Sequence, residues 1–175
     1  MADRSNQIVR EARRLLEEHG AEALTMRALA DQIGIRAPSL YKHVPDKGTL
    51  ETMLIAAGLT ELAEALEATE QREPGSLAGL ATTYRQFALD HPHLYRLIHS
   101  RPLPRQALPA GLEERTAMPV ARALGGDVHL ARAAWAFAHG MVILELNHRF
   151  PPDADLSVAW RVAIEAFTTA SAHSG

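Results

Sequence analysis

Residues 25–50 read TMRALADQIGIRAPSLYKHVPDKGTL, and their spacing decides the fold of the N-terminal region. Thr25 can cap a short helix whose buried face carries Leu29 and Ile33, and Gly34 breaks the helical pattern after them. A second short helix follows, with a proline in its first turn, where the missing amide hydrogen costs nothing. Two short helices joined by a glycine turn predict a helix-turn-helix motif, whose second helix can lie in the major groove of DNA.

The outward side chains of this stretch are of the types that contact DNA. Those that offer donors or a ring to phosphates and base edges are Arg36, Ser39, Tyr41, Lys42 and His43. Lys47 begins the next helix and is placed for a phosphate, while Thr25 and Arg27 at the start of the first short helix complete the candidate set. Both lysines of the chain lie in this stretch. The alternative is that these charges form an ordinary solvated face.

Composition favours helices along the whole chain. The 175 residues are 47% hydrophobic but only 5% aromatic, and the difference is alanine, the best helix former. The formal net charge of −3 excludes a strongly basic chain that binds polyanions by bulk charge, although it permits a local basic patch. Without cysteine there is no disulfide, thiol nucleophile or thiolate metal site.

Apolar periodicity predicts further helices beyond the motif. We expect a long helix of roughly 20 residues from Lys47 and later helices at about 77–91, 94–98, 127–148 and 154–172. No segment alternates convincingly with a period of two, so the predicted fold is all-α. Its expected domains are a three-helix helix-turn-helix domain at 1–47 and a helical ligand-binding and dimerisation domain at 48–175.

No segment has the form of a membrane span or a signal peptide. The most apolar stretch, 133–144, is shorter than the about 20 apolar residues that a spanning helix needs. The N-terminal residues carry charges and precede no apolar run of signal-peptide form. We therefore expect a cytoplasmic protein with no membrane partner.

The motif resembles the N-terminal domain of the TetR family of bacterial transcriptional repressors. The matching residues, in register over about 5–52, are Leu29-Ala30, Gly34-Ile35, Leu40-Tyr41-Lys42-His43-Val44, Lys47 and Leu50. The resemblance implies an Ω-shaped homodimer that binds an operator duplex, and a variable C-terminal domain that binds a small-molecule effector. One departure is Arg36, which stands where many members have a small hydroxyl residue that caps the recognition helix.

The C-terminal half resembles a subgroup of that family marked by a Trp…His-Gly signature. Here the signature residues are Trp135, His139 and Gly140, within the stretch AAWAFAHGM at 133–141. The family resemblance implies that the last two helices form a four-helix interface in the dimer. Their sequences agree with this, because both helices are apolar on more than one side and need a partner to cover them.

Aromatic and polar residues of the C-terminal half form a candidate effector pocket. The set is Tyr84, Phe87, His91, Tyr95, Met118, Trp135, His139 and Glu145, mainly apolar with a few polar groups, as ligand pockets are. For each residue taken alone, core packing is the favoured interpretation. Glu145, between two leucines, needs a partner such as an arginine or a ligand, unless it lies at the helix edge.

Other functions have less support in the sequence. We expect no metal site, because His139 and Glu145 are six residues apart and do not share a helical face. No nucleophile elbow, phosphate-binding glycine loop or HExxH motif is present, so we expect neither an enzyme nor a cofactor. The alternatives to a DNA-binding regulator are a helical dimerisation protein without DNA function and a small-molecule-binding protein or enzyme on a helical bundle.

Overall fold

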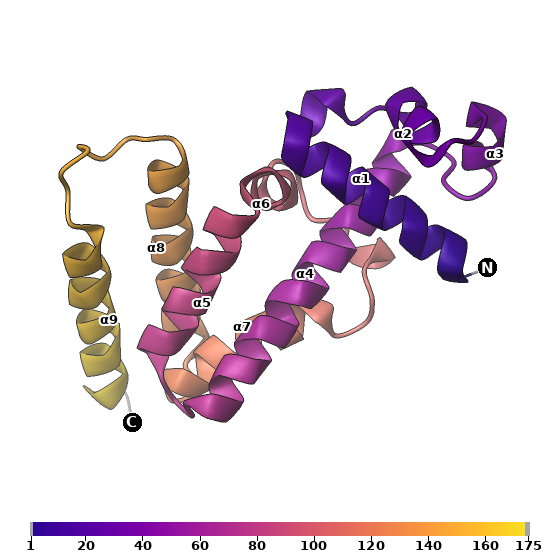
Figure 1. Ribbon diagram of the computed structural model, residues 1–175. Helices are drawn as coiled ribbons and strands as arrows, with labels where there is room; N and C mark the ends of the chain where they lie inside the picture. Colours follow the sequence, from indigo (N-terminus) through magenta and orange to yellow (C-terminus); the bar gives the residue numbers. More distant parts are fainter. Residues whose placement is uncertain (1, 174–175) are drawn as a thin grey trace. The chain divides into compact units, whose positions relative to one another are not determined.

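The computed structural model describes residues 2–173, which are almost entirely helical and contain no strand (Figure 1). The all-α prediction is therefore confirmed. The helices are α1 (Ala2–Ala23), α2 (Met26–Ile33), α3 (Ala37–Tyr41), α4 (Lys47–Arg72), α5 (Leu77–Asp90), α6 (Pro92–His99), α7 (Leu112–Ala123), α8 (Val128–Leu146) and α9 (Leu156–His173), with a short 3-10 helix η1 at Arg105–Ala107. Within the described part of the chain, no helix is both long and apolar enough to cross a bilayer.

The chain forms two compact units that do not follow chain order. The first comprises the residues up to Glu61 together with His91–Ala110, and the second comprises Leu62–Asp90 and the residues from Gly111 onward. Helix α4 contributes to both units. Helix α6 therefore belongs to the unit that holds the predicted helix-turn-helix, although it follows that motif by about forty residues.

The first unit is built on a core of fully buried aliphatic side chains. Helix α1 packs against α2 and α6, and α2 packs against α3. The core members with no exposed surface include Ile8, Leu16, Leu24, Leu29, Leu40, Val44, Leu50 and Leu54. Leu40 and Val44 are the anchors by which the short helix α3 and the turn after it are held in place.

Helix α6 is held against α1 and α4 by contacts at two places. Glu17 of α1 accepts hydrogen bonds from the backbone N–H groups of His93 and Leu94, at 3.3 and 3.1 Å. These bonds satisfy the open N-terminus of α6, whose own N-cap residue makes no side-chain cap. On α4, Gly58 allows a close approach: a Cβ there would lie 2.8 Å from Leu94 Cδ2.

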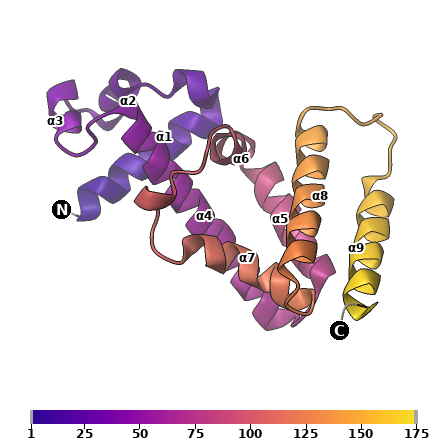
Figure 2. The same cartoon turned by 180° about the vertical axis from the view of Figure 1, so that it is seen from behind.

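The second unit packs α5 against α7, α8 and α9, and α8 also contacts α7 and α9 (Figure 2). Two ion pairs bind α7 to the end of α4, namely Arg115–Glu67 and Arg122–Glu70. Helix α4 continues to Arg72 and is therefore longer than the roughly 20 residues expected from the sequence. Both ion pairs lie in this last part of α4.

Candidate nucleic-acid interface

The first helix of the motif begins and ends as its sequence predicts. The hydroxyl of Thr25 accepts a hydrogen bond from the N–H of Ala28 at 3.1 Å, which is the predicted N-cap. Gly34 closes the helix in the left-handed region, with φ of 73°. Only glycine adopts this conformation without steric cost, and it turns the chain towards α3.

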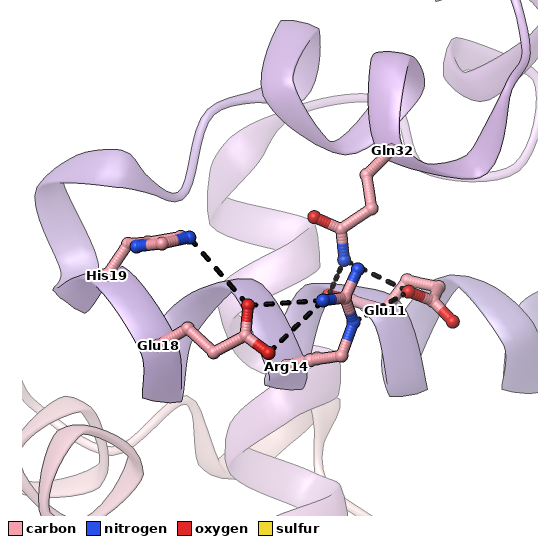
Figure 3. Close-up of polar contacts among 5 residues, drawn as sticks. All are labelled: Glu11, Arg14, Glu18, His19 and Gln32. Carbon is pink, nitrogen blue, oxygen red and sulfur yellow. Dashed lines mark hydrogen bonds and ion pairs between the residues drawn. The ribbon is translucent and has the colours of Figure 1, made fainter.

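Side-chain hydrogen bonds join α2 to α1 (Figure 3). The amide of Gln32 donates to the backbone carbonyl and to the carboxylate of Glu11, at 3.2 and 3.0 Å. Arg14 lies between Glu11 and Glu18 and pairs with both. The hydrogen bond from Gln32, with the one from Arg14, lowers the pKa of Glu11, so this link is made by an ionised carboxylate. Helix α2 is thereby braced against α1.

Helix α3, the predicted recognition helix, is five residues long, shorter than the about seven that its sequence suggests. The helix gives way to a turn at Lys42 and His43, before Val44, which is itself disfavoured in the helical region because it precedes Pro45. Lys42 is the C-cap residue, and His43 lies in the turn that follows. Arg36 is the N-cap, but its side chain makes no capping hydrogen bond and stays available for other partners.

Most of the predicted DNA-contacting side chains are presented to solvent. Tyr41 is 48% exposed, a large value for an aromatic residue, and Lys42 and His43 beside it are also exposed. Thr25, Arg27 and Arg36 are exposed as well, and Ser39 is partly so. Buried Leu40 fixes the inner side of the helix, so the polar side chains project from its outer side.

Three cations of this surface have no anionic partner among the described residues. Arg27, Arg36 and Lys42 are exposed and form no ion pair with any residue in the described range. By contrast, Arg13, Arg85, Arg115 and Arg122 each pair with a glutamate. The helix-turn-helix therefore carries three exposed, uncompensated positive charges that a phosphate backbone would neutralise.

Lys47, unlike Arg27, Arg36 and Lys42, has partners within the protein. Its ammonium group donates to the backbone carbonyl of Ala21 at 3.2 Å and lies 3.8 Å from a carboxylate oxygen of Glu51. Its side chain is still 42% exposed. Sequence analysis identified Lys47 and missed Glu51, although the spacing of four residues along a helix is a usable signal.

The residues of the predicted effector pocket are divided between the two units. Tyr84 and Phe87 are buried on α5, in the second unit. His91 and Tyr95 lie in the first unit, where His91 Nε2 is 3.2 Å from Glu61 and the fully buried ring of Tyr95 packs on His99. The grouping of the complete set in one pocket therefore stays a prediction.

Three further members of that set lie on α7 and α8. Met118 and Trp135 are 42% and 51% exposed. The rings of Trp135 and His139 stack one helical turn apart, with centroids 6.0 Å apart. Partial burial lowers the pKa of His139, which favours its neutral form. Within the described chain, no three His, Asp or Glu side chains are grouped so as to hold a metal ion.

Glu145 forms an ion pair with an arginine, as its position between two leucines led us to expect. Arg85 of α5 donates two hydrogen bonds to its carboxylate, from Nε at 2.9 Å and from Nη2 at 2.6 Å. This two-point pair joins α5 to α8, and the hydrogen bonds to Glu145 raise the pKa of Arg85. Sequence analysis did not identify Arg85, because the two residues are sixty positions apart and only the fold brings them together.

Family models match most of the chain in two segments. Residues 8–50 match the model described as bacterial regulatory proteins, tetR family. Residues 77–167 match the model described as tetracyclin repressor-like, C-terminal domain. The first segment contains most of α1, all of α2 and α3 and the start of α4, and the second contains all of α5 to α8 and most of α9.

Individual relatives agree with these matches. The HTH-type transcriptional regulator Rv1816 of Mycobacterium tuberculosis is 27% identical over 67% of this chain and 51% of its own length. The class A tetracycline repressor protein from transposon 1721, from Escherichia coli, is 41% identical over 32% of this chain and 26% of its own length. The chain spans about half the length of the first curated relatives that it matches.

A solved structure shares the fold over nearly the whole chain. A single-residue variant of TetR from Acinetobacter baumannii AYE, crystallised in complex with minocycline, superposes with a TM-score of 0.70. The two sequences are 22% identical, and the match covers 94% of each chain. This likeness concerns the fold, which the two proteins share despite their divergent sequences.

Proposed function

Because this chain belongs to the TetR family of bacterial regulatory proteins, we propose that it is a dimeric repressor that binds an operator duplex and is released from it by a small-molecule effector. The observation that carries the DNA-binding part is the outer surface of α3 and its flanking turns. There, exposed cations without an ion pair to any described residue lie on the same motif as the 48% exposed ring of Tyr41, and the first helix of that motif is capped at both ends. Cytoplasmic localisation follows as part of the same proposal, because a bacterial regulator must reach its operator DNA in the cytoplasm.

Removing the charge of Lys42 tests the DNA-binding proposal. We expect Lys42→Ala to weaken operator binding and to reduce the slope of log K against log salt by about 0.9, the value for one lost phosphate contact. Fluorescence anisotropy with a labelled operator duplex at several salt concentrations gives both quantities. Tyr41→Ala, which removes the exposed ring, is expected to weaken binding without the same change in slope.

The matched control is Arg149→Ala. Arg149 is an exposed cation that follows α8 in the second unit, and it has no ion pair with a described residue. Its salt slope should equal that of the unmodified protein. Unchanged operator affinity in both Lys42→Ala and Tyr41→Ala would refute the proposal that this motif binds DNA. A purely dimerising helical protein would give that result.

Exposed apolar side chains on α8 and α9 support the dimer. These helices carry large apolar side chains that are about half exposed, namely Val128, Trp135, Leu144, Val158 and Val162. Large apolar side chains exposed on two neighbouring helices are typical of helices that another protein covers. A second copy of the chain is the partner that the family supports, through an interface in which the same surface of both copies meets.

A charge introduced on this surface is expected to separate the subunits. In a symmetric interface Val162→Glu would bury two like charges, costing about 2 kcal/mol or more, which is about thirtyfold in the dissociation constant. Sedimentation velocity at micromolar concentration should show a dimer for the unmodified protein and monomer for the variant. Ala107→Glu, an exposed site in η1, is the control and should stay dimeric. A monomeric unmodified protein would contradict the dimer.

The effector part of the proposal concerns the second unit. The rings of Tyr84 and Phe87 are buried on α5, and partial burial lowers the pKa of His139 on α8, so the uncharged polar groups of this set are a phenolic hydroxyl and an imidazole. Such surroundings suit a largely apolar ligand. The Trp135, His139 and Gly140 signature supports assignment to the Trp…His-Gly subgroup. The minocycline complex of the Acinetobacter protein is an example of a ligand bound by a protein of this fold.

A further inference from the structure

Glu51 is a buried carboxylate in the first unit with incomplete hydrogen bonding. The residue is only 4% exposed, on the second turn of α4. Its Oε2 atom accepts no hydrogen bond from any described residue. A buried carboxylate destabilises the folded protein unless charges or donors compensate it, so the cations that face Glu51 are held near it.

Two cations face this one carboxylate, from different parts of the chain. Arg101 follows α6, and its Nη1 lies 2.7 Å from Glu51 Oε2, close enough for a strong ion pair although the direction is poor for a hydrogen bond. Lys47 lies one helical turn before Glu51, with its ammonium group 3.8 Å from Oε1. Lys47 and Arg101 therefore share the compensation of a single buried charge.

We propose that Glu51 and Arg101 are positioning residues that decide whether Lys47 is available to a DNA phosphate, an inference that rests on the proposed function. With Arg101 in contact, Glu51 is compensated, and Lys47 can leave it at little cost. With Arg101 withdrawn, Lys47 is the one cation among the described residues that still faces the buried carboxylate, and the ammonium group is retained. Any event that moves the segment after α6 would then change the charge that the protein offers to DNA.

The coupling has a test that needs no DNA. The chain has only two lysines, so Lys42, which has no ion pair with a described residue, is an internal reference for Lys47. Competitive acetylation followed by mass spectrometry measures the ratio of their rates, because an amine held against a carboxylate is less accessible to the reagent and reacts slowly. We expect Arg101→Ala to lower the Lys47/Lys42 ratio by about twofold to fivefold, the range of a partly exposed ion pair.

Glu51→Gln should act in the opposite direction. It removes the charge that retains Lys47, so the ratio should rise, both alone and in the Arg101→Ala background. Arg101→Lys keeps the cation and should leave the ratio unchanged. A purely structural role of Arg101 would not be reversed by Glu51→Gln. An unchanged ratio in Glu51→Gln alone overturns the proposal, even if Arg101→Ala does not fold by circular dichroism.

Operator binding then tests the consequence. We expect Arg101→Ala to reduce the salt slope by about 0.9, one phosphate contact. In the Lys47→Ala background, Arg101→Ala should reduce it no further. An additional loss there would show that Arg101 itself binds a phosphate and would overturn the proposal. If the unmodified protein binds duplex without salt dependence, the proposed function fails, whereas the acetylation ratios still decide whether the three residues are coupled.

Discussion

Replacing Gly58 by valine is expected to destabilise the protein by about 2–3 kcal/mol, the cost of inserting side-chain volume into a packed core. The site has no spare room. A Cβ on Gly58 would lie 2.8 Å from Leu94 Cδ2 and 3.1 Å from Ile98 Cδ1, and both neighbours are buried. Because Leu94 and Ile98 lie on α6, the strain falls on the contact between α4 and α6.

Gly58→Ala separates this steric effect from helix propensity. Alanine in place of glycine gains about 1 kcal/mol in a helix interior, whereas overpacking costs about 1–3 kcal/mol. Since Leu94 cannot move away into solvent, we expect a small net loss of stability. Gly140→Ala is the matched control, because a Cβ there meets no atom within 4 Å in this structure, and it should stabilise α8.

A compensating variant makes the Gly58 prediction sharper. Leu94→Ala alone should cost about 2–5 kcal/mol, but it removes the atoms that a valine at position 58 would strike. Urea unfolding of the two single variants and the double variant should therefore give a favourable coupling of about 1–3 kcal/mol. Additive losses would show that Gly58 is not limited by Leu94.

The second large effect is expected at the Arg85–Glu145 pair. Removing one partner of a fully buried pair costs about 3–5 kcal/mol, because the other charge is left uncompensated. The side chains here keep 33% and 18% of their surface exposed, so water partly screens them. We therefore expect Glu145→Ala and Arg85→Ala each to cost about 1–3 kcal/mol, a discounted value for a partly buried pair.

A double-mutant cycle checks that reasoning. Replacing both residues removes both charges, so the double variant should lose clearly less stability than the sum of the two single losses. Glu145→Gln keeps the shape and tests the charge alone. Arg161→Ala, whose pair with Glu165 is exposed on one helix, is the control and should change stability by less than about 0.5 kcal/mol. If the stability losses of Arg85→Ala and Glu145→Ala simply add in the double variant, the two side chains do not form a direct pair.

Local signals in the sequence were sufficient to predict the helix-turn-helix. Thr25 caps α2 and Gly34 ends it, as predicted, because both effects depend on a few neighbouring residues. The predicted length of α3 was less accurate, because the helix ends at Tyr41, two residues before the expected seven are complete. The extension of α4 to Arg72 could not be predicted, because Glu67 and Glu70 are compensated by arginines about fifty residues later.

The sequence by itself determined that this chain is helical, that residues 25–50 form a helix-turn-helix and that Tyr41 and Lys42 are presented to solvent. These properties follow from periodicity, capping and turn residues, which act over one or two helical turns. Only the tertiary structure decided that Arg85 binds Glu145, that Glu17 caps α6, and that Arg101 shares Glu51 with Lys47. A carboxylate in a sequence indicates that it needs a partner when buried, but which cation reaches it depends on how helices far apart in the chain pack together.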